Sequence, residues 1–284
     1  MTPLTQEERL DAMLDILLAE RPTAEELEAH KKRFQGLRYN AQDSLALPEK
    51  PWDLETKQKV WRGLVNIREP KPISSEYLAL EEAYLKGRLA DIETVSVNDL
   101  TPKAERLYLW QGDITHLAVD AIVNAANSDL LGCFIPNHAC IDNQIHTFAG
   151  VPLRQEMAQI MAKQGRREPV GKAKISKAYA LPAKYVIHTV GPTVTGDVNG
   201  IKESQLASSY RNSLKCATEA GLETLAFPCI STGEFAFPNE RAAEIAVATV
   251  KKYLVKKDPQ LKVIFNVFGD QDRVIYEKLL EQEG

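Results

Sequence analysis

Two cysteines and a histidine lie within eight positions of one another near the middle of the chain. Cys133, His138 and Cys140 belong to the stretch Gly-Cys-Phe-Ile-Pro-Asn-His-Ala-Cys, which runs directly into a helix-like segment. Thiolates and imidazole suit zinc, and a helix N-terminus lowers the pKa of nearby thiols. Three protein ligands leave a tetrahedral ion one open position, which is typical of catalytic zinc sites. The spacing therefore favours a metal site that can take water or substrate.

Two other interpretations of this cluster stay open on the sequence alone. Taken singly, each cysteine is more often a small buried residue, and a loop histidine is more often simply polar. A structural zinc site would instead need a fourth ligand, for which Cys216, Cys229 and His146 are candidates. We expect Cys216, within a helix, and Cys229, at the end of a strand, to pack in the core.

Polar side chains also follow two predicted strands. Asp113 comes directly after the first, and a carboxylate there can accept hydrogen bonds from an exocyclic amine such as that of adenine. Asn127 ends the stretch Val-Asn-Ala-Ala-Asn, and its amide can bond the vicinal hydroxyls of a sugar. Each residue alone is explained as well by a turn or a cap.

A loop of small and hydroxyl-bearing residues follows a later predicted strand. Residues 230–235 read Ile-Ser-Thr-Gly-Glu-Phe and precede a predicted helix that begins at Asn239. Backbone N–H groups and Ser or Thr hydroxyls can hold phosphate without a basic side chain, although many loops share this composition. Phe268, at the end of the last predicted strand, fits stacking on a base, whereas periodicity alone favours the core.

The elements that must position these residues alternate after residue 106. Periodicity predicts strands at 106–111, 121–124, 174–180, 185–189, 224–229 and 262–268, and helices at 141–163, 204–220, 239–256 and 271–281. This order predicts an α/β fold whose largely parallel sheet is covered on both faces. Ligands of such folds bind outside the carboxyl ends of the strands, so the loops after Asn124 and Cys229 should carry the chemistry. We expect His188, within a strand, to be a hydrogen-bonded core histidine.

The first hundred residues show helical spacing only. Helices are predicted at 5–20, 22–37, 53–65 and 74–89, with Thr5, Thr23, Asp53 and Ser74 near their starts. We therefore expect a helical extension over residues 1–100 and a second domain over residues 101–284.

Composition excludes several classes of protein. The 284 residues carry 35 Lys and Arg against 39 Asp and Glu, and 44% are hydrophobic. These values disfavour a disordered chain and a nucleic-acid binder that acts through gross positive charge. No apolar run reaches membrane-spanning length, and residues 1–20 are charged throughout, unlike a secretory leader. We expect a cytoplasmic protein without membrane or nucleic-acid partners, in which four cysteines do not form a disulfide framework.

Together the motifs resemble those of macrodomains, which bind ADP-ribose. Gly-Asp-Ile-Thr at 112–115, Val-Asn-Ala-Ala-Asn at 123–127 and Ile-Ser-Thr-Gly at 230–233 have the order and separation of that family, over about residues 105–284. The resemblance implies a three-layer α/β/α fold with a mixed, mostly parallel sheet. Where many macrodomains have a glycine run and a Val-Asp-Gly-Ala-Ile-His helix start, this chain has the Cys133–Cys140 segment and Ile-Asp-Asn-Gln-Ile-His at 141–146. That departure resembles the zinc-dependent microbial subgroup, whose members also carry a helical N-terminal extension.

The resemblance implies a role for each motif. It implies that Asp113 and the Ile114 backbone bind adenine, that Phe268 stacks on the base, and that Asn127 positions the distal ribose. It implies contacts to ADP-ribose from Asn143 and from Ser231, Thr232, Gly233, Glu234 and Phe235, the last five at the diphosphate. Because a carboxylate is unfavourable beside phosphate, we expect Glu234 to point away from the diphosphate or toward the distal ribose. Zn²⁺ would be held by Cys133, His138 and Cys140.

The subgroup's members are mono-ADP-ribosyl hydrolases, associated with a sirtuin-type ADP-ribosyltransferase and a lipoyl-carrier protein of the glycine-cleavage H type. The resemblance therefore implies removal of ADP-ribose from a modified protein side chain, most plausibly a carboxylate, with Asp142 and Asn127 as catalytic residues. His146, one turn after Asp142, is more simply structural. Two alternatives stay open: a module that binds ADP-ribose without cleaving it, and a deacetylase of O-acetyl-ADP-ribose.

Overall fold

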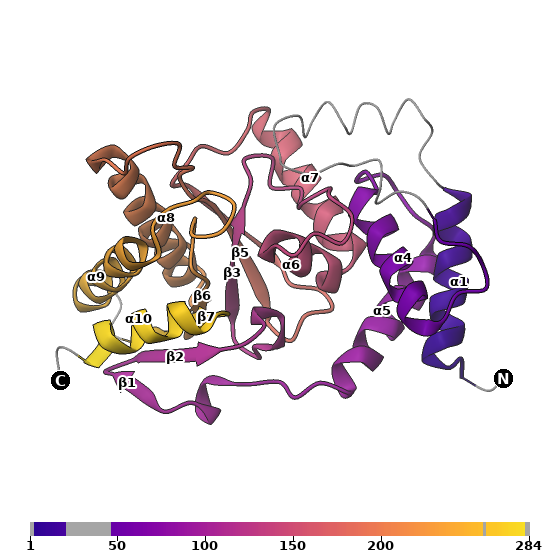
Figure 1. The fold of residues 1–284 in the computed structure, drawn as a ribbon, viewed down its shortest axis with the longest axis horizontal. Helices are drawn as coiled ribbons and strands as arrows, with labels where there is room; N and C mark the ends of the chain where they lie inside the picture. The colour runs from indigo at the N-terminus through magenta and orange to yellow at the C-terminus, as the bar shows by residue number, and fades with distance from the viewer. Residues whose placement is uncertain (1–2, 21–46, 258–259, 282–284) are drawn as a thin grey trace. The chain divides into compact units, whose positions relative to one another are not determined.

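The computed structural model describes residues 3–20, 47–257 and 260–281 (Figure 1). The helix predicted at 22–37 lies outside these residues. The described residues fall into two compact units, one within 1–92 and 131–158 and the other within 93–130 and 159–284. We call them the first and the second unit. None of the helices in the described ranges is long and apolar enough to cross a membrane.

The second unit is built on a mixed sheet of seven strands flanked by helices (Figure 1). The strands are β1 (Pro102–Ala104), β2 (Leu107–Gln111), β3 (Ala121–Ala126), β4 (Ala173–Lys177), β5 (Tyr185–Val190), β6 (Thr224–Phe227) and β7 (Lys262–Val267). In the order β1-β2-β7-β6-β3-β5-β4, the inner five strands are parallel to one another and both edge strands are antiparallel to their neighbours. The six predicted strands are confirmed, and the sequence missed only the short, Pro-containing β1.

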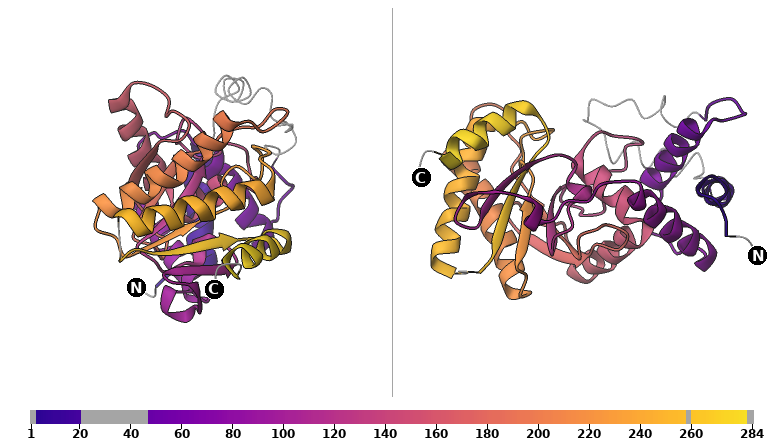
Figure 2. Two further views of the ribbon diagram at one scale, coloured as in Figure 1. Left: turned by 90° about the vertical axis from the view of Figure 1, so that its left-hand side faces the viewer. Right: turned by 90° about the horizontal axis from the view of Figure 1, so that it is seen from below.

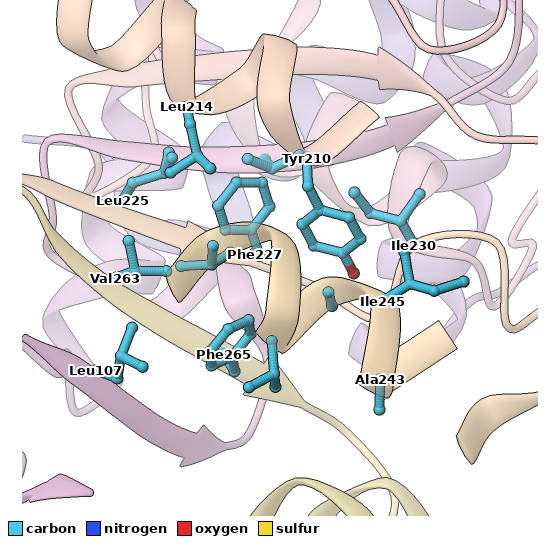
Figure 3. Packing of buried hydrophobic residues seen from close by; sticks show 14 of the residues in the cluster. Leu107, Tyr210, Leu214, Leu225, Phe227, Ile230, Ala243, Ile245, Val263 and Phe265 are labelled. Carbon is cyan, nitrogen blue, oxygen red and sulfur yellow. The ribbon is translucent and has the colours of Figure 1, made fainter. Parts of the chain in front are cut away.

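Three helices cover one face of this sheet and close its core. They are α8 (Gly200–Glu219), α9 (Asn239–Lys257) and α10 (Asp270–Glu281), and Figures 1 and 2 show α8 and α9 side by side. Alternate strand residues meet the apolar stripes of the helices in one buried cluster (Figure 3). Aromatic pairs lie at its centre, with ring centroids 4.9 Å apart for Tyr210 and Phe227 and 5.2 Å for Phe265 and Tyr276. Such offset pairs add stabilisation beyond their area burial.

The first unit is helical. It contains α1 (Gln6–Ala19), α4 (Leu54–Ile67), α5 (Ser75–Ala90), α6 (Ile141–Ala149) and the start of α7 (Val151–Gln164). Helix α1 packs against both α4 and α5. The side chains of Thr5, Asp53 and Ser74 each accept a hydrogen bond from a backbone N–H in the first turn that follows, so the starts expected for these three helices are confirmed.

The single helix predicted at 141–163 is wrong, because the chain breaks at Gly150. Gly150 has φ +89°, a conformation that favours glycine. The break turns the Val151 N–H toward the Glu81 carboxylate, whose Oε2 accepts it at 2.8 Å. A Cβ on Gly150 would lie 2.8 Å from the same oxygen, so a side chain would clash there.

His188 is the hydrogen-bonded core histidine that the sequence predicted. It is fully buried on β5, with Nδ1 3.1 Å from Asn124 Nδ2 on β3 and Nε2 2.9 Å from Ser176 Oγ on β4. Burial lowers the pKa of His188 to about 3. The imidazole is therefore neutral in the folded protein and links three adjacent strands.

This pKa predicts a loss of stability in acid. Between pH 6.5 and about 3 the unfolded chain binds a proton at His188 that the folded chain does not, so stability present above pH 6.5 falls as the pH falls. We expect this residue alone to cost about 2 kcal/mol at pH 5, relative to pH 7.5. Urea unfolding of metal-free protein at both pH values measures the loss. His188→Gln keeps a donor and an acceptor but does not titrate, so the variant should lose less stability; an equal loss in both proteins would contradict the assignment.

Candidate functional site

The structure brings the three predicted metal ligands together in the first unit. One ligand atom each from Cys133, His138 and Cys140 lies within 4.8 Å of the others, and Cys133 Sγ is 3.5 Å from His138 Nδ1. Two sulfurs and an imidazole nitrogen at this separation fit a zinc ion. We call residues 131–140 the metal loop. Cys216 and Cys229 pack against the hydrophobic cluster of the second unit, as expected.

The two thiols differ in acidity. A hydrogen bond from Cys140, helped by the Ile135 N–H and by His138, outweighs burial and lowers the pKa of Cys133 to about 6. The same pairing, together with burial, raises the pKa of Cys140. The lowered pKa of Cys133 favours its thiolate, which is the form of cysteine that binds metal ions.

A glycine and a histidine shape the start of the metal loop. Gly132 has φ +84°, and a Cβ there would lie 2.7 Å from Cγ of the His146 ring. His146 is buried on α6, with Nε2 3.6 Å from Asp142 Oδ1. Asp142 lies in the first turn of α6, for which Cys140 is the N-cap. Asp142 and the metal loop are thus positioned by the same helix start.

Asn143 is fully buried, and both ends of its amide are engaged within the first unit. Its Nδ2 donates to Ile135 O at 2.9 Å, and its Oδ1 accepts from Arg62 Nη2 at 2.7 Å. This geometry favours a bracing role for Asn143 over direct contact with ADP-ribose. Sequence reasoning did not identify Arg62, because its partner is 81 positions away along the chain.

Arg154 is a second residue that the sequence analysis missed. Its buried guanidinium donates through Nε to Leu131 O at 2.8 Å, and through Nη1 to the carbonyls of Val65, Asn66 and Arg68 at 2.7–2.9 Å. It also lies over the Phe134 ring, 4.3 Å from the centroid. Burial lowers the pKa of Arg154 to about 10, which still leaves it charged at neutral pH. This side chain joins the end of α4 to the metal loop.

Asp113 lies in the second unit, at the carboxyl end of β2. Its Oδ1 accepts from Thr115 N at 2.9 Å and from Thr115 Oγ1 at 2.7 Å, and so begins a short helical turn at Ile114–His116. These bonds use one of the two carboxylate oxygens. Asn127, after β3, accepts from Asp129 N at 2.9 Å through Oδ1. The turn-forming interpretation of both residues is therefore correct. Either side chain can form its turn and also contact a ligand.

The predicted phosphate loop has an unusual backbone after β6. Ser231 has φ +69° and its carbonyl accepts from Phe237 N at 2.9 Å, while Gly233 O accepts from Ala236 N at 2.9 Å. The buried Ser231 Oγ has no hydrogen-bond partner among the residues that the structure describes. Unpaired buried hydroxyls are uncommon in folded proteins, which makes Ser231 Oγ a candidate contact for a ligand. Glu234 is exposed.

Phe268 corrects the expectation from periodicity. It follows β7 directly and is 80% exposed, so the core interpretation was wrong. Gln111 Nε2 donates to its carbonyl at 3.2 Å, which ties it to the end of β2. A large exposed aromatic ring beside Asp113's strand remains suited to stacking on a base.

Gly132→Ala should weaken zinc binding, because the added Cβ meets the His146 ring and φ +84° is strained for alanine. We expect a 10–100-fold loss of affinity, as for other changes just outside a metal's ligand shell. Competition with a chromophoric chelator measures it. Gly165→Ala is the matched control, because Gly165 also has positive φ, at +70°, but nothing lies within 4 Å of its Cβ position. Equal zinc affinities in the two variants would contradict the interpretation.

Comparison with known proteins agrees with this geometry. The Macro domain family matches residues 123–246. A "Protein-ADP-ribose hydrolase" from Staphylococcus aureus is 46% identical over 268 residues, which cover 92% of this chain and 99% of that protein. A protein of the same name from Treponema medium is 43% identical over 281 residues, covering 98% of this chain and all of that one.

Solved structures show the same fold. A Trypanosoma brucei macrodomain in complex with ADP-ribose has a TM-score of 0.61 and 28% identity, covering 77% of this chain and 94% of that one. An Oceanobacillus iheyensis macrodomain with ADP has a TM-score of 0.56 and 34% identity, covering 62% of this chain and 90% of that one. The similarity along nearly the whole chain, together with the shared fold, shows that this chain belongs to the macro domain family.

Proposed function

We propose that this protein is a hydrolase that removes ADP-ribose from modified proteins. The observation that carries the proposal is the similarity, over almost its whole length, to proteins named Protein-ADP-ribose hydrolase. The solved Trypanosoma brucei relative binds ADP-ribose, which supports the same ligand here. We infer that residues 101–284 form the macrodomain proper, within which residues 131–158 pack with the N-terminal helices.

The second unit supplies the groups for nucleotide binding. Asp113 accepts from the adenine amine, beside the Ile114 backbone, and Phe268 stacks on the base. The loop at 231–235 binds the diphosphate through backbone N–H groups and the Ser231 hydroxyl, whereas the Thr232 hydroxyl donates to Cys229 O at 3.0 Å. Because Glu234 is exposed, its carboxylate can point into solvent and away from that diphosphate. Asn127 positions the distal ribose.

The first unit supplies the metal centre. Cys133, His138 and Cys140 fit Zn²⁺ in number, type and separation. A zinc ion held there would supply Lewis acidity and would lower the pKa of a bound water toward ~7. Two residues keep the ligands in place. Gly132 lets the loop pass close to the His146 ring, and the Asn143 amide donates a hydrogen bond to the Ile135 carbonyl.

The bond that breaks joins ribose C1 to an oxygen of the modified side chain, most plausibly a carboxylate. Water attacks C1, the C1–O bond breaks with its electron pair going to the carboxylate, and C1 passes through an oxocarbenium-like state. Asp142 accepts the proton of the attacking water. General base help of this kind is typically worth 10²–10⁴-fold in rate. Asn127 orients the ribose for the attack.

The substrate and its setting follow from the family resemblance. We propose a mono-ADP-ribosylated lipoyl-carrier protein of the H type as the substrate and a sirtuin-type transferase as the opposing enzyme. We also propose that the protein is cytoplasmic. All four cysteines are free thiols, which is typical of proteins in that reducing compartment.

Release of free ADP-ribose from a protein that carries carboxylate-linked ADP-ribose tests this function. We expect turnover to disappear when a chelator strips the metal and to return when zinc is added. Asp142→Asn should lower kcat by about 10²-fold or more, with unchanged affinity for ADP-ribose. Asp113→Ala should instead weaken ADP-ribose binding.

Asp91→Asn is the control, because Asp91 is an exposed carboxylate at the end of α5. Tight ADP-ribose binding without release under any condition would contradict the hydrolase and favour a binding module. Release only from O-acetyl-ADP-ribose would favour a deacetylase.

A further inference from the structure

One face of α4 contacts the metal loop through two polar side chains, Arg62 and Asn66. They are four positions apart, so they lie on the same side of the helix. Between them Gly63 gives the loop room: a Cβ there would lie 3.2 Å from Asn137 Nδ2 and 3.6 Å from Pro136 Cβ. The loop therefore lies directly against the backbone of α4. All of these residues belong to the first unit.

Arg62 bridges the metal loop and the first turn of α6. Its Nη2 donates to the backbone carbonyl of His138 at 2.9 Å and to Asn143 Oδ1 at 2.7 Å, and its Nε donates to the same Oδ1 at 3.2 Å. His138 is a metal ligand, and Asn143 is in the first turn of α6, just after the ligand Cys140. One guanidinium thus sets the distance between His138 and the start of α6.

Asn66 holds the loop at a neighbouring point. Its Oδ1 accepts from Asn137 N at 2.9 Å, directly before His138, and its Nδ2 donates to Thr147 Oγ1 at 2.9 Å on α6. Asn66 and Thr147 are both fully buried. Loss of their hydrogen bond would therefore leave a buried polar group with neither a protein partner nor water. Helix α4 therefore bonds to the loop and to α6 at two successive turns.

We propose that Arg62 is a positioning residue for the metal centre, and that α4 is part of that centre rather than a separate stabilising cap. The proposal rests on the zinc site of the proposed function. Arg62 fixes the His138 backbone and the Asn143 amide. It thereby orients the metal ligands without binding the metal itself. Its planar fork matters because a lysine ammonium cannot make the same set of bonds.

Zinc affinity of the full-length protein tests this role without relying on turnover. Metal-free wild type, Arg62→Lys and Arg62→Gln compete for zinc with a chromophoric chelator. We expect both variants to bind zinc 10–100-fold more weakly, the range typical of lost outer-shell partners. Their affinity for ADP-ribose should change much less than their affinity for zinc, because Arg62 bonds to the metal loop and to α6. Lys59→Gln is the matched control, since Lys59 is an exposed cation on the same helix, paired with Glu55.

Hydrogen exchange of metal-free protein separates positioning from general stability. We expect faster exchange over residues 131–143 in both Arg62 variants, with the remaining helices of the first unit unchanged. An Arg62→Lys protein that folds normally and binds zinc as tightly as wild type would overturn the proposal, as would equal losses of zinc affinity in Arg62→Lys and Lys59→Gln. Wild type that binds zinc but releases no ADP-ribose would contradict the proposed function and leave this role intact. Wild type that binds no zinc would contradict both.

Discussion

The buried guanidinium of Arg154 sets the main constraint on the first unit. A charge away from water must find hydrogen-bond partners, and leaving it unpaired costs several kcal/mol. Here the partners are three carbonyls at the end of α4 and the Leu131 carbonyl at the start of the metal loop. These helix-end carbonyls would themselves need partners, so the cation also acts as a C-terminal cap. The loop and the N-terminal helices therefore fold together.

A buried carboxylate caps the N-terminal end of α7, as Arg154 caps the C-terminal end of α4. Glu81 on α5 accepts from Val151 N at the start of α7, and the Tyr77 hydroxyl donates to it at 3.0 Å. Burial raises the pKa of Glu81 to about 7, in spite of these donors. Glu81 and Arg154 thus connect α5, α4 and the start of α7 by bonds to helix ends. In this way the N-terminal helices support the segment that holds Cys133, His138 and Cys140, a role that charge patterns along exposed helix faces do not reveal.

The sequence predicted most of the second unit, because strand and helix periodicity are local signals. It also placed Asp113, Asn127 and the 231–235 loop correctly at the carboxyl ends of strands, since parallel pairing brings those ends to one edge of the sheet. What it missed depends on distant contacts. The break at Gly150 needs the Glu81 carboxylate, 70 positions from Val151. Arg62 and Arg154 looked like ordinary charged helix residues, and the exposure of Phe268 could not be read from its alternation with buried neighbours.

The proposed metal centre is one zinc ion with an open fourth position, held by Cys133, His138 and Cys140 on a loop that the N-terminal helices support. X-ray absorption at the zinc edge of the zinc-loaded, ligand-free protein tests it most directly. We expect two sulfur atoms at about 2.3 Å, one imidazole nitrogen at about 2.0–2.1 Å, and one further light atom. A shell of three or four sulfur atoms, or one of nitrogen and oxygen alone, would contradict it.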